Sequence, residues 1–77
     1  MTLAEELEIA CIDEMRGDPP GPALARRLER AVTTVLRRRN IRGARVQATS
    51  SRRGGTAVRL WLPADGPRVR EVVLRLG

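Results

Sequence analysis

The chain contains no lysine, histidine, tyrosine or phenylalanine, and its 77 residues include one cysteine and one tryptophan. Without histidine, no side chain has an ordinary pKa near neutrality, and without tyrosine there is no phenolic acid, which excludes most general acid–base catalysis. One cysteine cannot form an internal disulfide, and the usual zinc ligands are missing. We therefore expect no enzyme activity, no catalytic residues, no cofactor, no metal site and no small-molecule substrate.

Long apolar runs are also absent. No stretch approaches the 18 or so apolar residues of a transmembrane helix, and the acidic N-terminus lacks the pattern of a secretory signal. We expect no membrane partner, and a cytoplasmic location or a place in a virion. The length suits one small domain over residues 1–77. A core with almost no aromatic side chains is thin, which favours a homo-oligomer or a component of a larger assembly.

The chain is rich in arginine, and its acidic and basic residues are segregated along the sequence. All fifteen basic residues are arginine, and the net formal charge is +6. Residues 1–18 have a formal charge of −5, whereas residues 19–77 have a formal charge of +11. A concentrated basic field attracts anions, so the partner we expect is a nucleic acid or an acidic protein surface.

Residues 1–18 predict an acidic helix. Thr2 and Glu5 have the spacing of a capping box, and Gly17 followed by Asp18 and two prolines is a stop signal. A stripe of apolar side chains follows the helical period, with Glu5, Glu6 and Asp13 opposite it. The stripe consists of Leu3, Leu7, Ala10, Cys11 and Met15. Cys11 is best interpreted as a small buried hydrophobe whose acidic neighbours raise its thiol pKa.

Residues 22–40 predict an arginine-rich amphipathic helix that begins at Pro22. Asn40 suits a left-handed cap at its end. The apolar arc consists of Leu24, Ala25, Leu28, Ala31, Val32, Val35 and Leu36, and the other side carries Arg26, Arg27, Arg30, Arg37 and Arg38.

Residues 44–76 predict a β-hairpin and a third strand. Two segments, 44–50 and 56–62, alternate with period two and are joined by a loop containing two glycines. Their inward face would carry Val46, Ala48, Val58, Leu60 and Leu62. A turn follows at 63–67, and residues 68–76 fit either a strand or a short helix, with the β-branched content favouring the strand. The fold class predicted is α+β, with two N-terminal helices packed on one face of a three-stranded antiparallel β-meander.

Two surfaces are candidate binding sites. The first is an arginine face suited to nucleic-acid phosphates, formed by Arg26, Arg27, Arg30, Arg37, Arg38, Arg52 and Arg53. The alternative is that these charges are only a solvated face. The second is a partner contact at Arg59 and Trp61, which share a strand face with Ala57. The alternative is that Trp61 closes the edge of the core of its own chain. The acidic helix would dock on the arginine face of its own chain or on an arginine surface of a neighbouring copy.

The stretch from Arg27 to Leu62 combines a long helix containing Leu28-Glu29-Arg30-Ala31, an arginine-rich end and a β-hairpin. In this outline it resembles the C-terminal half of baseplate wedge subunits from contractile phage tails and related injection machines. The resemblance implies a structural subunit of a larger assembly, which is our second functional hypothesis. The Glu-Pro-Arg motif of that family is absent, with Arg37-Arg38-Arg39 at the comparable place, so no functional residue is carried over.

Overall fold

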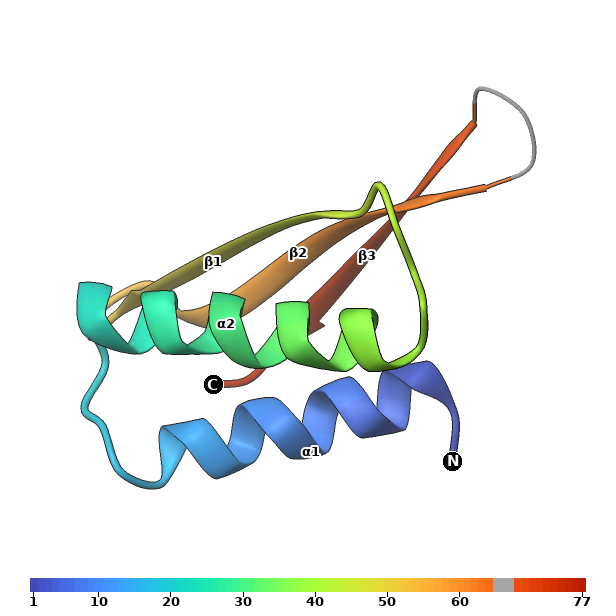
Figure 1. Cartoon of the computed structure of the whole chain (residues 1–77). Coiled ribbons are helices and arrows are strands. Elements are labelled where there is room, and N and C mark those ends of the chain that lie inside the picture. Colours follow the sequence, from blue (N-terminus) through green and yellow to red (C-terminus); the bar gives the residue numbers. More distant parts are fainter. Residues whose placement is uncertain (65–67) are drawn as a thin grey trace.

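Two helices precede a three-stranded sheet in this computed structural model, which describes residues 1–64 and 68–77 (Figure 1). The elements are α1 (Leu3–Met15), α2 (Pro22–Arg38), β1 (Arg45–Ser51), β2 (Gly55–Pro63) and β3 (Val69–Arg75). The strands are antiparallel in the order β1-β2-β3. This confirms the α+β layout and makes the third segment a strand. The turn expected at 63–67 includes Asp65, Gly66 and Pro67, which lie outside the described residues.

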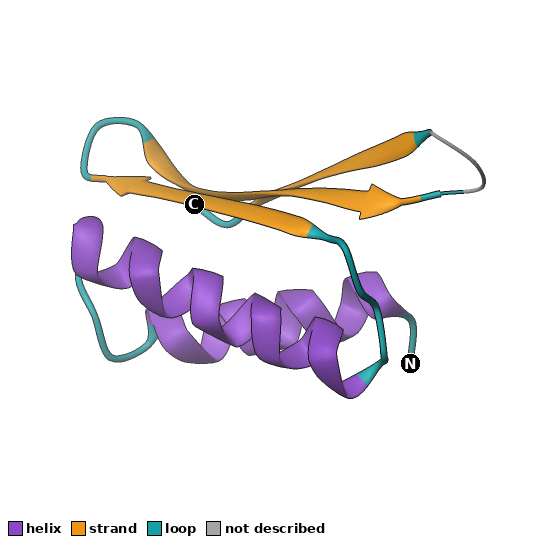
Figure 2. Ribbon diagram, turned by 45° about the horizontal axis from the view of Figure 1, so that its top comes forward, coloured by secondary structure: helices purple, strands orange, loops and turns teal. Residues whose placement is uncertain are grey.

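The helices form one layer and the sheet forms the other (Figure 2). α1 and α2 run side by side beneath the same face of the sheet, and α2 lies closest to β1. No element of the described ranges covers the opposite face. An antiparallel sheet tolerates this arrangement because one of its faces can remain in water.

The core lies between the two layers and is aliphatic. Its largest fully buried side chains are Leu7, Leu24, Leu28, Leu60, Val32, Val35, Val58 and Cys11. The helix residues in this set belong to the two stripes expected from the 3.6-residue period, and the strand residues belong to the expected inward face. Burying each large aliphatic side chain contributes about 1.5–3 kcal/mol, so this small set supplies most of the hydrophobic stabilisation.

Residue pairing in the sheet decides which side chains share each face. Ala48 pairs with Val58 on the inward face, whereas Gln47 pairs with Arg59 on the outward face. On the other side of β2, Arg59 pairs with Val73. A shift by one residue would exchange the two faces, so the apolar inward set fixes this register.

The helix ends are capped as the sequence predicts. The Thr2 hydroxyl accepts a hydrogen bond from the Glu5 amide at 3.2 Å, and the Glu5 carboxylate accepts one from the Thr2 amide at 3.1 Å. These bonds lower the pKa of Glu5. At the end of α2, Asn40 adopts a φ of 58°, and the Ile41 amide donates to the Leu36 carbonyl at 2.9 Å. This cap turns the chain from α2 toward β1.

The solvent side of α1 differs from the expectation. Glu6 does not lie on the exposed side, because its carboxylate is 2.6 Å from the Arg39 Nε and joins α1 to the end of α2. The exposed side instead includes Ile9 and Ile12, with exposed fractions of 50% and 43%. The apolar stripe itself packs as expected, with Leu7 and Cys11 buried.

Candidate nucleic-acid interface

Three arginines form a row along the solvent side of α2. Arg26, Arg30 and Arg37 are four and seven residues apart, so they lie on one side of the helix, and all three are exposed. The row is about 16 Å long at 1.5 Å per residue. We call Arg26, Arg30 and Arg37 the arginine row.

The arginine row has few internal partners. No carboxylate of residues 1–64 or 68–77 lies within 4.0 Å of these three guanidinium groups. Glu29 is close along the helix, but one of its carboxylate oxygens accepts a hydrogen bond from the Ala48 amide of β1 at 3.1 Å. The row therefore presents positive charge to solvent, with the Glu29 carboxylate held against the sheet and Glu14 of α1 lining one shallow hollow together with Arg30.

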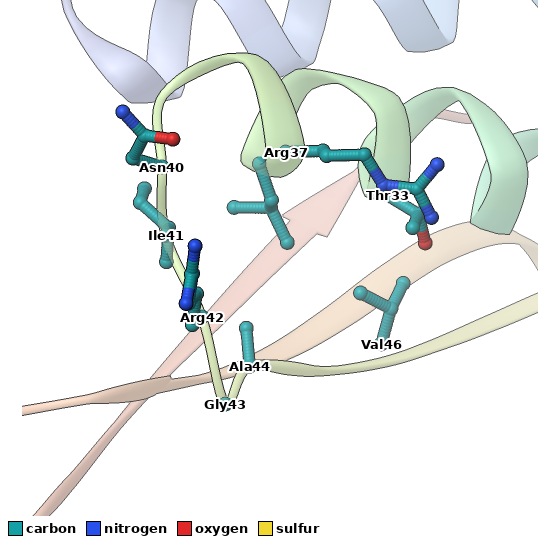
Figure 3. A pocket seen from close by; sticks show the side chains of 9 residues that line it. Thr33, Arg37, Asn40, Ile41, Arg42, Gly43, Ala44 and Val46 are labelled. Atoms are coloured by element: carbon teal, nitrogen blue, oxygen red, sulfur yellow. The ribbon is translucent and has the colours of Figure 1, made fainter.

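A hollow of about 420 Å³ continues the row between the end of α2 and the start of β1. Arg37 stands on the last turns of α2, Arg42 on the loop that follows, and Val46 on β1, all around this hollow (Figure 3). Arg42 was not among the arginines expected at the interface. Its position depends on the Asn40 turn, which brings the loop back beside α2, and helical periodicity contains no signal for that.

Arg27 and Arg38 do not belong to the arginine row. They are eleven residues apart and share a neighbouring strip of α2. Arg27 borders one shallow hollow with Arg26 and Arg30, and another with Arg30 and Glu14 of α1. The Arg27 Nε is 3.1 Å from the Asp18 Oδ2, a buried oxygen without a hydrogen bond among the described residues. The expected arginine face is thus two adjoining strips that meet at Arg27 and Arg30, and the second strip is partly neutralised by Asp18.

Arg52 and Arg53 lie at the turn between β1 and β2, and both are exposed. The Gly21 amide at the start of α2 donates a hydrogen bond to the Ser50 hydroxyl at 3.1 Å, and Ser50 in turn is 2.9 Å from the Thr56 hydroxyl. This contact places the turn at the same end of the molecule as the start of α2 (Figure 1). The structure therefore brings Arg52 and Arg53 near the beginning of the arginine row.

Trp61 and Arg59 lie on the outward face of the sheet, as expected. The guanidinium carbons of Arg45 and Arg59 are 5.8 Å and 6.0 Å from the centre of the Trp61 ring, which is within cation–π range. The Arg59 Nε is also 3.3 Å from a carboxylate oxygen of Glu71 on β3. Trp61 is partly exposed and faces away from the helices, so it does not close the core edge.

The Cys11 thiol is fully buried between the layers. Burial raises its pKa to about 11, and the Glu14 carboxylate adds to the shift. The direction is the one expected, but the main cause is loss of solvent and not the acidic neighbours. A protonated, buried thiol is a weak nucleophile.

None of the helices in the described ranges is long and apolar enough to cross a membrane. Comparison of the chain with protein families, with curated proteins and with solved structures finds no match.

Proposed function

We propose that the protein is a non-enzymatic module that binds nucleic-acid phosphates through the arginine row and the adjoining Arg42. The observation that carries this proposal is the alignment of Arg26, Arg30 and Arg37 on one exposed side without a carboxylate within 4.0 Å in the described part of the chain. Guanidinium groups bind phosphate oxygens in pairs of parallel hydrogen bonds, which makes arginine well suited to this contact.

The length of the arginine row fits a duplex backbone. About 16 Å along α2 corresponds to roughly five base-pair steps of 3.4 Å. Arg52 and Arg53 extend the contact beyond the start of α2. No aromatic side chain accompanies the row among the described residues, so the contact supports binding to the phosphate backbone and not base stacking.

The test is a titration of the protein into a labelled duplex of mixed sequence at several salt concentrations. We expect a dissociation constant of about 10⁻⁴–10⁻⁶ M near physiological salt and a plot of log K against log salt with a slope of about −4 for four phosphate contacts. The Arg26→Glu/Arg30→Glu variant should bind at least about tenfold more weakly and with a shallower slope.

A matched control separates this site from general basicity. Arg45→Glu/Arg75→Glu changes the net charge by the same amount but lies on the outward face of the sheet. It should weaken binding much less than Arg26→Glu/Arg30→Glu does. Equal loss in the two variants, or no salt-dependent binding by the parent protein, contradicts the proposed interface.

A further inference from the structure

Two exposed surfaces on opposite sides of the molecule both carry apolar side chains. On α1, Ile9 and Ile12 are one turn apart and point away from the core residues Leu7 and Cys11. On the outward face of the sheet, Val73 is 43% exposed. Because α1 lies beneath the inward face of the sheet, these two surfaces point away from each other (Figure 2).

The two surfaces have opposite charge. The helix face is the exposed side of α1 and consists of Glu5, Glu8, Ile9, Ile12 and Asp13. Arg16 follows the last residue of α1, and its guanidinium nitrogen is 3.9 Å from an Asp13 carboxylate oxygen. Its charge offsets one of the three acids of the helix face.

The sheet face is the outward side of the three strands and includes Arg45, Ala57, Arg59, Trp61, Val73 and Arg75. Arg59 lies at its middle, between Gln47 and Val73, while Arg45 and Arg75 lie toward its edges. The Glu71 carboxylate, ion-paired with Arg59, offsets one of the three arginines. Each face therefore combines apolar side chains with a net charge, and the two net charges have opposite signs.

The dimensions of the two faces also agree. The helix face extends about 12 Å from Glu5 to Asp13 at 1.5 Å per residue, and the sheet face extends about 13 Å from Ala57 to Trp61 at 3.3 Å per residue. A hollow of about 220 Å³ lies over the small side chain of Ala57, and it is bordered by Gln47, Thr49, Arg59, Val73 and Arg75. Within it, Ala57 and Val73 offer an apolar contact to an isoleucine side chain.

We propose that the helix face of one copy binds the sheet face of a second copy, so that the protein assembles head to tail. The contact would give the sheet a second helical layer like the one that already covers its inward face. Since the two faces differ, the interface is heterologous and generates rings or open chains of copies. One helix on a small sheet buries less than the roughly 1,200 Å² of a stable interface, so association is weak and concentration-dependent. The arginine row lies outside both faces.

The experiment is sedimentation velocity of the full chain over a concentration series that reaches about 1 mM. We expect the average mass to rise with concentration at about 50 mM salt and the association to weaken about tenfold at about 500 mM, because salt screens the opposite charges of the two faces. A parent protein that stays monomeric throughout the low-salt series overturns the proposal.

Two variants then identify the faces. Ile9→Arg/Ile12→Arg disables the helix face, and Val73→Glu/Arg75→Glu disables the sheet face. Each alone should remain monomeric, whereas an equal mixture should form a one-to-one complex and nothing larger, because each variant retains the face that the other has lost. Continued self-association of either variant alone, or no complex in the mixture, overturns the proposal.

Control variants test whether assembly depends on these two faces alone. Arg26→Glu/Arg30→Glu should assemble like the parent, which makes assembly separable from phosphate binding; loss of assembly in this variant assigns the contact to α2 and overturns the proposal. Circular dichroism verifies that each variant is folded. If the isoleucine variant loses helix, Glu8→Arg/Asp13→Arg tests the same face by charge alone, with the same expected monomer and the same one-to-one complex.

Discussion

Among the described glycines, Gly55 is the one where an added Cβ atom would meet the closest neighbouring atom. Its φ is +77°, and a Cβ atom built there would lie 2.1 Å from the Gly77 carbonyl oxygen. That oxygen accepts a hydrogen bond from the Thr56 amide at 3.0 Å, which extends the pairing of β2 with the end of the chain. A side chain at Gly55 would therefore strain the backbone and displace this bond.

We expect Gly55→Ala to lower the free energy of unfolding by about 1–3 kcal/mol, because the left-handed conformation and the displaced carbonyl outweigh the entropy lost from the unfolded chain. Urea unfolding measures the change. Gly17→Ala is the matched control, since nothing lies within 4 Å of a Cβ built at Gly17. Equal stability of the two variants would mean that the turn at Gly55 rearranges freely.

Individual residues also mark the limit of sequence reasoning. The positions of Trp61 and Asn40 followed from the period of a strand and from the conformational preference of asparagine. The exposure of Ile9 and Ile12 did not, because α1 has apolar residues on more than one side and only the position of α2 decides which side is buried. The position of Arg42 beside the arginine row was not predicted for a similar reason, because a loop residue has no sequence period that indicates where it lies.

At the scale of elements, Glu29 links α2 to β1. Its carboxylate accepts the Ala48 amide at 3.1 Å, and Ala48 lies on an edge strand, where alternate backbone groups have no strand partner. The same carboxylate is the nearest negative charge to the arginine row along the helix. Glu29 therefore stabilises the fold through this hydrogen bond, while its negative charge weakens the phosphate binding that we propose.

Glu29→Gln should separate these effects. The amide oxygen of glutamine can still accept the Ala48 hydrogen bond, so stability should fall by only about 0.5–1 kcal/mol, while duplex affinity at low salt should rise about two- to fivefold. Urea unfolding and the duplex titration measure the two quantities. Glu29→Ala should cost more stability, because the Ala48 amide loses its partner. Unchanged or weaker duplex binding by Glu29→Gln would argue that phosphates bind away from α2.

The elements themselves were well predicted. The bounds of the helices and strands agree with the predicted ranges to within three residues, because capping residues and apolar periods are local signals. The division of the arginines of α2 into two strips was not predicted. The spacing of the arginines along α2 contains the division itself, but the ion pair of Arg27 with Asp18 depends on where Asp18 lies, which the helix sequence alone does not indicate.

For the whole molecule, the dependence of stability on alkaline pH reports on a single side chain, the Cys11 thiol. The chain has no lysine and no tyrosine, and arginine keeps its proton, so Cys11 is the side chain that titrates between about pH 9 and pH 11. Its pKa is raised from 9.0 to about 11 in the folded protein. The folded state thus holds this proton more tightly, and the associated stability is complete below about pH 9 and lost as the pH rises through 11.

We expect the free energy of unfolding to fall by about 2 kcal/mol between pH 8.5 and pH 11, and we expect the Cys11→Ala variant to lack that fall. The variant should be less stable at pH 8.5 because a small cavity replaces the sulfur. Urea unfolding at a series of pH values measures both. Parallel pH profiles in the two proteins would show that a different process destabilises the fold in alkali.

The order of the elements has a kinetic consequence. Each element packs mainly against the one that precedes or follows it in the chain, from the helix pair through the α2–β1 contact to the meander. Short sequence separations cost little chain entropy on closure, so the search for the native arrangement is brief. The fastest phase of refolding after dilution from denaturant should end within milliseconds, in the range of other mixed helix–sheet proteins whose contacts are mostly local.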